Sequence, residues 1–308
     1  MVLGAVGSKL RPARARACNV ASGLQHLFCR ARIDFDLDAA TGLTEMRAKS
    51  LSQRASTTLL AAILALLTPT VAASRDQILT VGGQNLHIET LGESGPTVVF
   101  EAGLGTDTST WRLVSASVAK FARVMLYDRA GLGQSMPFNT SAAVTADHVA
   151  TNLHNLLGAA DIRPPYMLVG HSLGGLYVQM FTRKYPNEIS GVVLLDSAST
   201  EAPSELKTRA RLEPGSAAYL EQEGVAEGNE QVRSAGPFPD IPLTVIAATD
   251  HGPFFKDWEP TLMGLQQQLA TLSPRADLIV AQGSGHDIQI DRPVTVIDAI
   301  RRMALPGK

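Results

Sequence analysis

The sequence predicts an α/β fold in which helices cover both faces of a mostly parallel sheet. Two observations lead to this class. Short apolar segments alternate with longer helical patterns from residue 97 onward, and several of these segments are apolar throughout. Val192-Val193-Leu194-Leu195 is one such run. A strand that is apolar on both sides belongs between two layers of helices, which is the place of a central strand in a parallel sheet.

The first two strands are expected to form an antiparallel hairpin, because segments 78–81 and 86–90 flank the turn-forming Gly82-Gly83-Gln84-Asn85. The alternation that follows is regular and continues to the end of the chain. It predicts strands at 97–100, 123–127, 166–170, 191–195, 243–247 and 278–281, and helices at 142–157, 173–184, 260–272 and 294–303.

A polar segment at about 197–240 interrupts this alternation. It contains helix-prone sequence such as 204–212 and ends in Pro237-Phe238-Pro239. Because it is inserted between two predicted strands, we interpret it as a short helical lid beside the carboxyl ends of the sheet.

The composition excludes several classes of partner. The chain is 45% hydrophobic, and its 27 basic and 29 acidic residues give a formal net charge of −2, so nothing favours nucleic acid as a partner. Cys18 and Cys29 are the two cysteines, too few for a disulfide framework or a cysteine-rich zinc site. We expect no metal and no organic cofactor.

Residues 46–73 have the pattern of an export signal. A basic start at 46–49 precedes an apolar run at 59–67 and a small-residue cleavage site at 71–73. The run is shorter than the roughly 20 residues that span a bilayer, which disfavours a retained anchor. We expect a mature domain over 74–308 that is periplasmic or secreted and meets a membrane only during export.

The residues before Met46 need a separate explanation, since signal peptides act at the beginning of a chain. They include the arginine-rich stretch 11–16 and show no strong periodicity. We interpret 1–45 as an upstream gene-model extension or a disordered segment. The alternative is a basic transit peptide, against which three aspartates within 34–38 argue, because transit peptides are poor in acids.

A nucleophile is predicted where the strand 166–170 runs into Gly170-His171-Ser172-Leu173-Gly174 and then into a helix. In G-x-S-x-G the serine sits on a strained strand-to-helix turn, and the flanking glycines avoid a Cβ collision. The five-residue match is weak by itself. Its position between a strand and a helix is the context that the motif requires, so Ser172 is the predicted nucleophile.

On these residues the chain resembles the α/β-hydrolase superfamily over about 78–304. The loop Asp128 to Ser135 is similar to the superfamily's D-x-x-G-x-G-x-S loop. Its G-x-G could indicate a nucleotide site, but a further glycine and a clear following helix are missing, so a structural loop is favoured.

His286 is the predicted base among seven histidines. A serine hydroxyl needs a positioned imidazole to accept its proton. In the resembled family this histidine lies in the loop after the last strand, where Gly285-His286 stands here. His251 also follows a strand and is the main competitor, whereas His171 is interpreted as a packing residue of the turn.

Two aspartates can complete the site. Asp250 follows the strand 243–247 and matches the family's usual position for the acid, while Asp196 follows the strand 191–195 and matches a variant position. Both would lie at the carboxyl edge near the serine, and the chain order Ser, Asp, His holds for either. Asp250 is preferred, with Asp196 as the alternative acid.

The oxyanion hole is expected to use two backbone amides. Leu173 supplies one because it directly follows the nucleophile, and Leu104 is assigned the other, with Gly103 as the alternative. Many relatives have His-Gly at this second loop, where this chain has Ala102-Gly103.

The resemblance implies a serine hydrolase that cleaves a carboxylic ester, in preference to an amide, of a small or medium apolar compound through an acyl-enzyme. The alternatives are a lyase or perhydrolase with the same triad, or a non-catalytic binding protein on the hydrolase scaffold, because fold alone does not establish activity. The substrate is set by lid and pocket residues, and 197–240 contains no diagnostic motif.

Overall fold

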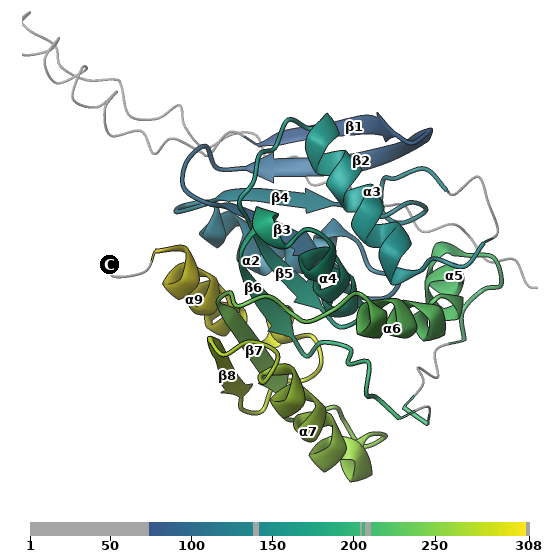
Figure 1. Cartoon of the computed structure of the whole chain (residues 1–308), viewed down its shortest axis with the longest axis vertical. Coiled ribbons are helices and arrows are strands. Elements are labelled where there is room, and N and C mark those ends of the chain that lie inside the picture. The colour runs from purple at the N-terminus through teal and green to yellow at the C-terminus, as the bar shows by residue number, and fades with distance from the viewer. Residues whose placement is uncertain (1–73, 138–141, 204, 207–210, 306–308) are drawn as a thin grey trace, which may run out of the picture. The chain divides into compact units, whose positions relative to one another are not determined.

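The computed structural model describes residues 74–137, 142–203, 205–206 and 211–305 (Figure 1), and all of these belong to the unit Pro69–Lys308. The interpretations of 1–45 and 46–73 lie outside the described residues. None of the helices in these ranges has the length and apolarity needed to cross a membrane.

An eight-stranded sheet forms the centre of this unit, in the order β1-β2-β4-β3-β5-β6-β7-β8. β2 pairs antiparallel with β1 and β4, and the other neighbours pair parallel. The mostly parallel sheet and its antiparallel hairpin are thereby confirmed. The strands are β1 (Arg75–Val81), β2 (Gln84–Leu91), β3 (Thr97–Glu101), β4 (Arg123–Tyr127), β5 (Tyr166–His171), β6 (Ile189–Leu195), β7 (Leu243–Ala248) and β8 (Ala276–Ala281).

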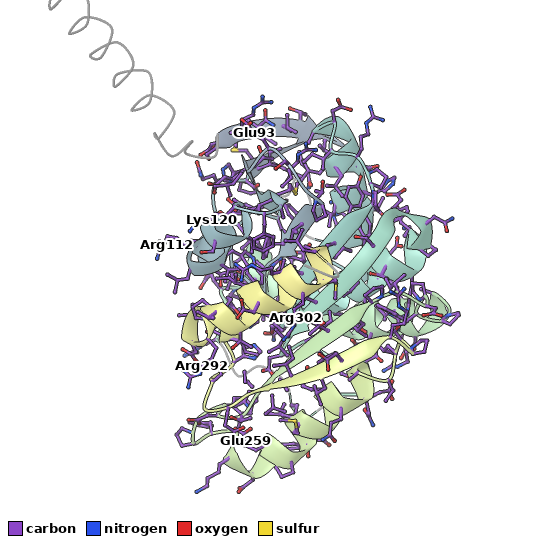
Figure 2. All side chains as sticks on the ribbon, turned by 90° about the vertical axis from the view of Figure 1, so that its left-hand side faces the viewer. Glu93, Arg112, Lys120, Glu259, Arg292 and Arg302 are labelled. Carbon is purple, nitrogen blue, oxygen red and sulfur yellow. The ribbon has the colours of Figure 1, made fainter. Side chains whose placement is uncertain are left out.

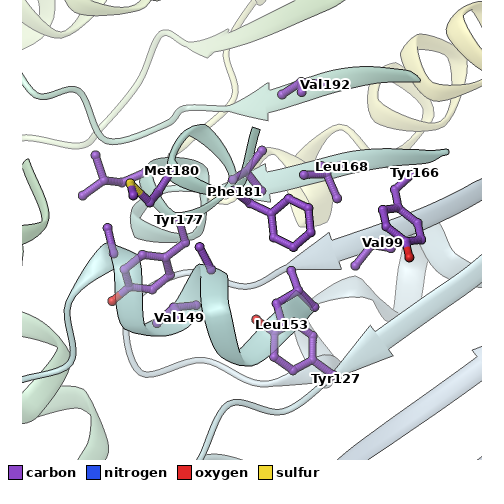
Figure 3. Packing of buried hydrophobic residues seen from close by; sticks show 14 of the residues in the cluster. Val99, Tyr127, Val149, Leu153, Tyr166, Leu168, Tyr177, Met180, Phe181 and Val192 are labelled. Carbon is purple, nitrogen blue, oxygen red and sulfur yellow. The ribbon is translucent and has the colours of Figure 1, made fainter. Parts of the chain in front are cut away.

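Helices lie on both faces of the sheet, as predicted. Alternate residues of a strand enter opposite cores: Val99 of β3 packs with residues of α3 and α4, whereas Val98 and Phe100 pack with residues of α2 and α9. Figure 3 shows the first core, where Phe181 and Leu153 lie between helices and sheet. The helices are α2 (Arg112–Val118), α3 (Ala146–Ala159), α4 (Leu173–Lys184), α5 (Ala217–Glu223), α6 (Val225–Ser234), α7 (Glu259–Leu269), α8 (Ile288–Asp291) and α9 (Pro293–Ala304).

The hairpin turn is tighter than predicted. Gln84 and Asn85 pair with Val81 and Thr80, so the loop contains only Gly82 and Gly83, at φ +58° and +81°. Two successive residues at positive φ define the two-residue turn that matches strand twist, and glycine reaches this conformation without strain.

Helix boundaries differ from the prediction in several places, and α7 ends at Leu269, three residues before the predicted end. α3 begins at Ala146 instead of residue 142, because the side chain of Thr145 accepts a hydrogen bond from the His148 amide and caps the helix there. Between β6 and β7, the helices are α5 and α6, and the described residues of 204–212 are not helical. The side chain of Ser216 caps α5 in the same way.

Parallel pairing brings the carboxyl ends of β5, β6, β7 and β8 to one edge of the sheet. The residues that follow these strands are Ser172, Asp196, Asp250 with His251, and the loop that leads to His286. Residues more than 100 positions apart can therefore meet in this region.

Candidate active site

Ser172 lies between β5 and α4 in a backbone conformation that non-glycine residues rarely adopt, with φ 53° and ψ −123°. Its amide donates to the carbonyl of Leu195 at 3.0 Å, and its carbonyl accepts from the amides of Gly175 and Ala198 at 2.9 Å each. The turn is thus held by hydrogen bonds to the ends of β6 and α4, and Leu173 becomes the first residue of the helix.

The two glycines of the motif have no room for a side chain. A Cβ on Gly170 would lie 2.8 Å from the carbonyl oxygen of Gly174, and one on Gly174 would lie 2.4 Å from the carbonyl oxygens of Glu101 and Ala102. These contacts are closer than van der Waals packing permits, so the sharp turn requires glycine at both positions.

His286 joins Ser172 to an aspartate. Its Nε2 lies 2.9 Å from Ser172 Oγ, and its Nδ1 lies 2.6 Å from Asp196 Oδ2. A neutral ring with its proton on Nδ1 satisfies both contacts, since the carboxylate accepts from Nδ1 and the serine hydroxyl donates to Nε2. The His286 side chain is 46% exposed and that of Asp196 is 5% exposed, so the ring reaches solvent while the acid is buried.

Asp250, the acid that the sequence favours, is not the residue that contacts His286. Its side chain is exposed and accepts a hydrogen bond from the amide of Gly252, two residues further along its own loop. The alternative, Asp196, occupies the position beside His286 because it follows β6, the strand next to β5. Of the two aspartates predicted from sequence, the structure thus brings the alternative, Asp196, and not the preferred Asp250, into contact with His286.

A second histidine binds the same carboxylate oxygen. His251 Nε2 lies 2.7 Å from Asp196 Oδ2, and His251 Nδ1 lies 2.9 Å from Glu259 Oε2. Burial opposes ionisation of Asp196, but the hydrogen bonds and charges of His251 and His286 hold its pKa well below its usual range. Asp196 is consequently an anion at neutral pH.

His171, interpreted from sequence as a packing residue, also contacts the site. Its Nε2 lies 3.0 Å from the backbone carbonyl of His286, and the two rings are 4.7 Å apart. Burial, followed by repulsion from His286, lowers the pKa of His171 to about 4, so this ring is neutral and donates its Nε2 proton to the carbonyl. It supports the loop that carries His286.

The loop after β3 lies against the serine. A Cβ on Gly103 would be 3.4 Å from Ser172 Cβ. The carbonyl of Gly103 accepts from Arg129 Nη2 at 2.6 Å and from the Thr106 amide at 3.2 Å. Because a trans peptide places N–H and C=O on opposite sides, the Leu104 amide points away from Arg129.

Arg129 ties this loop to α5. Its guanidinium contacts Glu101 Oε1 and Glu221 Oε1 at 2.6 Å each, and it donates to the carbonyl of Ala102 at 2.7 Å. Glu221, on α5, also accepts from the Gly105 amide at 2.9 Å. All three charged side chains are at most 4% exposed. A residue of the segment predicted as a lid is therefore part of the support of the loop beside Ser172.

Asp196, His251 and His286 are also a possible metal-binding group, since ligand atoms of all three lie within 4.8 Å of one another. Their present contacts are hydrogen bonds that converge on one carboxylate oxygen, and the second nitrogen of each ring already faces Ser172 or Glu259. A metal ion would have to replace the shared hydrogen bonds, so hydrogen bonding accounts for this arrangement of donors and acceptors.

Comparison with known proteins defines the class. A family model described as the alpha/beta hydrolase fold matches residues 96–222. The chain is also 32% identical, over 242 residues, to the uncharacterized protein YqjL of Bacillus subtilis (strain 168), with 74% of this chain and 92% of that protein covered. The chain belongs to the α/β-hydrolase superfamily.

Two solved structures illustrate the shared fold. Cfl2 from Burkholderia cenocepacia aligns with a TM-score of 0.61 at 20% identity, covering 77% of this chain and 98% of that one. The carboxylesterase CesB from Bacillus subtilis aligns with a TM-score of 0.58 at 15% identity, covering 77% of this chain and 93% of that one. At these identities the likeness concerns the fold.

Sequence reasoning missed the parts of the site that depend on contact between distant elements. His251 was considered only as a rival base, Arg129 only as part of a loop motif, and Glu259 and Glu221 not at all. For His251 a signal existed, because it follows a strand at the same edge as the other site residues. For Glu221, inside a polar helix 92 residues from Arg129, the sequence offers no local signal.

Proposed function

We propose that this protein is a serine hydrolase that cleaves a carboxylic ester, in preference to an amide, of a small or medium apolar compound through an acyl-enzyme. The observation that carries the proposal is the continuous hydrogen-bonded chain from Ser172 Oγ through His286 to Asp196 Oδ2. Hydroxyl, imidazole and carboxylate in this order are the groups that nucleophilic acyl transfer needs.

In the first half-reaction, Ser172 Oγ attacks the ester carbonyl while its proton moves to His286 Nε2. Asp196 stabilises the imidazolium that forms, because its carboxylate already accepts from Nδ1 at 2.6 Å. His286 then returns the proton to the leaving alkoxide, and the C–O bond breaks to leave the acyl group on Ser172. In the second half-reaction, water attacks the acyl-enzyme with His286 as base, which releases the acid and restores the hydroxyl.

The negative charge on the carbonyl oxygen needs donors on the other side of the serine. Leu173, as the first residue of α4, has an amide without an intrahelical acceptor, and the helix N-terminus adds a favourable dipole. The Leu104 amide, directed away from Arg129 on the loop beside Ser172, is the second donor that we assign. Loss of one such donor typically reduces kcat by about 100- to 1,000-fold.

Related chemistry in this superfamily is less consistent with the residues present. Relatives that open epoxides or remove halogens use aspartate as nucleophile, and Ser172 stands at that position here.

Labelling with a fluorophosphonate probe tests the proposal, together with hydrolysis of p-nitrophenyl esters of increasing acyl length. We expect the protein to be labelled and to hydrolyse these esters, and Ser172→Ala to abolish labelling and lower kcat by roughly a million-fold, as for the loss of other serine nucleophiles. Ser190→Ala is the matched control, because Ser190 lies at the start of β6 and donates to the Tyr166 carbonyl. Undiminished labelling of the Ser172 variant would overturn the assignment.

A further inference from the structure

We propose that His251 is a positioning residue of this site: held by Glu259, it fixes the Asp196 carboxylate and places a permanent positive charge behind His286. The inference rests on the proposed function and extends it, because a serine triad requires one histidine on its acid and this chain has two.

The contacts connect the three loops that follow β6, β7 and β8. Asp196 Oδ2 lies 2.6 Å from His286 Nδ1 and 2.7 Å from His251 Nε2, while Asp196 Oδ1 faces the Ala248 amide at 3.3 Å. Glu259, the first residue of α7 (Figure 2), binds His251 twice, at its ring Nδ1 at 2.9 Å and at its backbone amide at 2.6 Å. The carboxylate that orients His286 is thus itself held from the opposite side.

Counting donors and acceptors gives the charge of His251. Both ring nitrogens face carboxylate oxygens, and an ionised carboxylate can only accept. A neutral imidazole carries one N–H and would leave a lone pair against one of the two carboxylates. Only the doubly protonated, cationic ring satisfies both contacts. His286 differs, because its Nε2 faces a serine hydroxyl that can donate.

The electrostatics of the described residues agree with this count. Burial opposes the charged ring, but Asp196, followed by Glu259, raises the pKa of His251 to about 9. The ionisable side chains that face His251 are Asp196 after β6, Glu259 on α7 and His286 after β8, whose ring centre is 6.1 Å away. At neutral pH the ring is a cation paired with two anions.

A cation at this distance opposes the formation of a second cation on His286. His286 must be uncharged to accept the serine proton, so a neighbouring positive charge keeps the base available at lower pH. The same charge offsets part of the stabilisation that Asp196 gives to the imidazolium in the transition state. His251 therefore favours the uncharged form of His286, against the opposite influence of Asp196.

The pH profile of kcat/KM in His251→Gln tests this role. Glutamine has an amide that can still donate to Asp196 but carries no charge. We expect the acid limb of the profile to move to higher pH by about one unit, the order of effect for a unit charge at this distance in a partly buried site. The rate of fluorophosphonate labelling against pH should move in the same direction.

His87→Gln is the matched control. His87 is also buried between two carboxylates, with Nδ1 2.8 Å from Asp128 and Nε2 3.0 Å from Asp76, but it lies on β2 outside the proposed machinery. It should lower stability without moving the acid limb. The inference is overturned if the acid limb of the kcat/KM profile does not move in a folded His251→Gln variant. It is also overturned if the limb moves equally in the His251→Gln and His87→Gln variants.

Histidine NMR of the unmodified protein provides a second readout that needs no activity. At pH 7 the ring of His251 should carry protons on both nitrogens, and Glu259→Gln should lower the pH at which one is lost. A His251 ring with a single proton at pH 7 overturns the inference even if the glutamine variant fails to fold. Failure of the proposed function would give a different result, because the unmodified protein would then not react with the fluorophosphonate probe at any pH.

Discussion

Ser172 has a backbone conformation that costs free energy and is maintained by its surroundings. A non-glycine residue in a sparsely populated region of φ and ψ costs about 1 to 3 kcal/mol. Three backbone hydrogen bonds, to Leu195, Gly175 and Ala198, hold the turn. In this conformation the hydroxyl lies beyond the end of β5, 2.9 Å from His286 Nε2.

The proposal that Asp196 is the acid leads to a prediction for single-residue variants. Asp196→Asn should lower kcat by about 10,000-fold, because the amide favours the wrong tautomer of His286 and cannot stabilise the imidazolium. Asp250→Asn should leave kcat within about twofold, since its exposed side chain only accepts from the Gly252 amide and asparagine can also accept. Steady-state kinetics on a p-nitrophenyl ester measures both, and a larger loss in the Asp250 variant would reverse the assignment.

At the scale of elements, α5 and the loop after β3 form one supported unit. They meet in two places: Glu221 accepts from the Gly105 amide, and Gly105 lies so close to α5 that a Cβ on it would be only 2.7 Å from Ala218 Cβ. Glu221 also binds Arg129, which follows β4. Arg129 in turn donates to the carbonyls of Ala102 and Gly103. The direction of the Leu104 amide therefore depends on a helix inserted between β6 and β7.

Arg129→Lys tests this dependence. Lysine keeps the positive charge but lacks the planar fork that contacts two carboxylates and two carbonyls at once. We expect kcat to fall by about 10- to 100-fold with a small change in KM, because a misdirected amide affects the transition state more than the bound substrate. Breaking a buried ion pair destabilises a fold by about 3 to 5 kcal/mol, so thermal unfolding must be measured alongside.

Arg163→Lys is the control for that variant, since Arg163 is 83% exposed and pairs with the exposed Asp161. It should change neither kcat nor unfolding. A rise in KM alone in the Arg129 variant would indicate that the cluster shapes the binding of substrate and does not orient the Leu104 amide.

At the scale of the whole molecule, two histidines limit the pH range in which the fold is most stable. His171 acts at the acid end of this range and His251 at the alkaline end. The pKa of His171 falls from 6.5 to about 4 on folding, mainly because burial disfavours the charged ring, so stability is lost as pH falls from 6.5 through 4. His251 has a folded pKa of about 9, so its contribution is full below 6.5 and is lost as pH rises through 9.

Urea unfolding at pH 6.5 and pH 4 measures the acid side. His171 alone should reduce the free energy of unfolding by about 3 kcal/mol over this interval, because burial lowers its pKa from 6.5 to about 4 and the unfolded chain therefore takes up a proton that the folded ring resists. His171→Asn should show a correspondingly smaller decrease, and equal decreases in the two proteins would contradict the assignment of His171 as a buried neutral ring.

Much of this architecture is predictable because its signals are local. The apolar strands, the glycine turn and the elbow around Ser172 each depend on residues that are neighbours in the chain. The prediction of His286 also used the resemblance to the α/β-hydrolase superfamily, in which the histidine follows the last strand. α2 was not predicted, since its seven residues contain too few helical turns for a periodic pattern to be recognised.

By itself the sequence determined the succession of strands and most of the helices along the chain, and the sharp turn at Ser172, because steric limits on the backbone and burial of apolar runs act over a few residues. The prediction of His286 as the base came from the resemblance to the α/β-hydrolase superfamily. Tertiary structure decided which aspartate reaches His286, that His251 and Glu259 stand behind it, and that Arg129 joins α5 to the loop after β3. These contacts depend on which strand ends and helices become neighbours in space. Hydrogen bonds act only over a few ångströms, so they separate two aspartates that the sequence alone cannot distinguish.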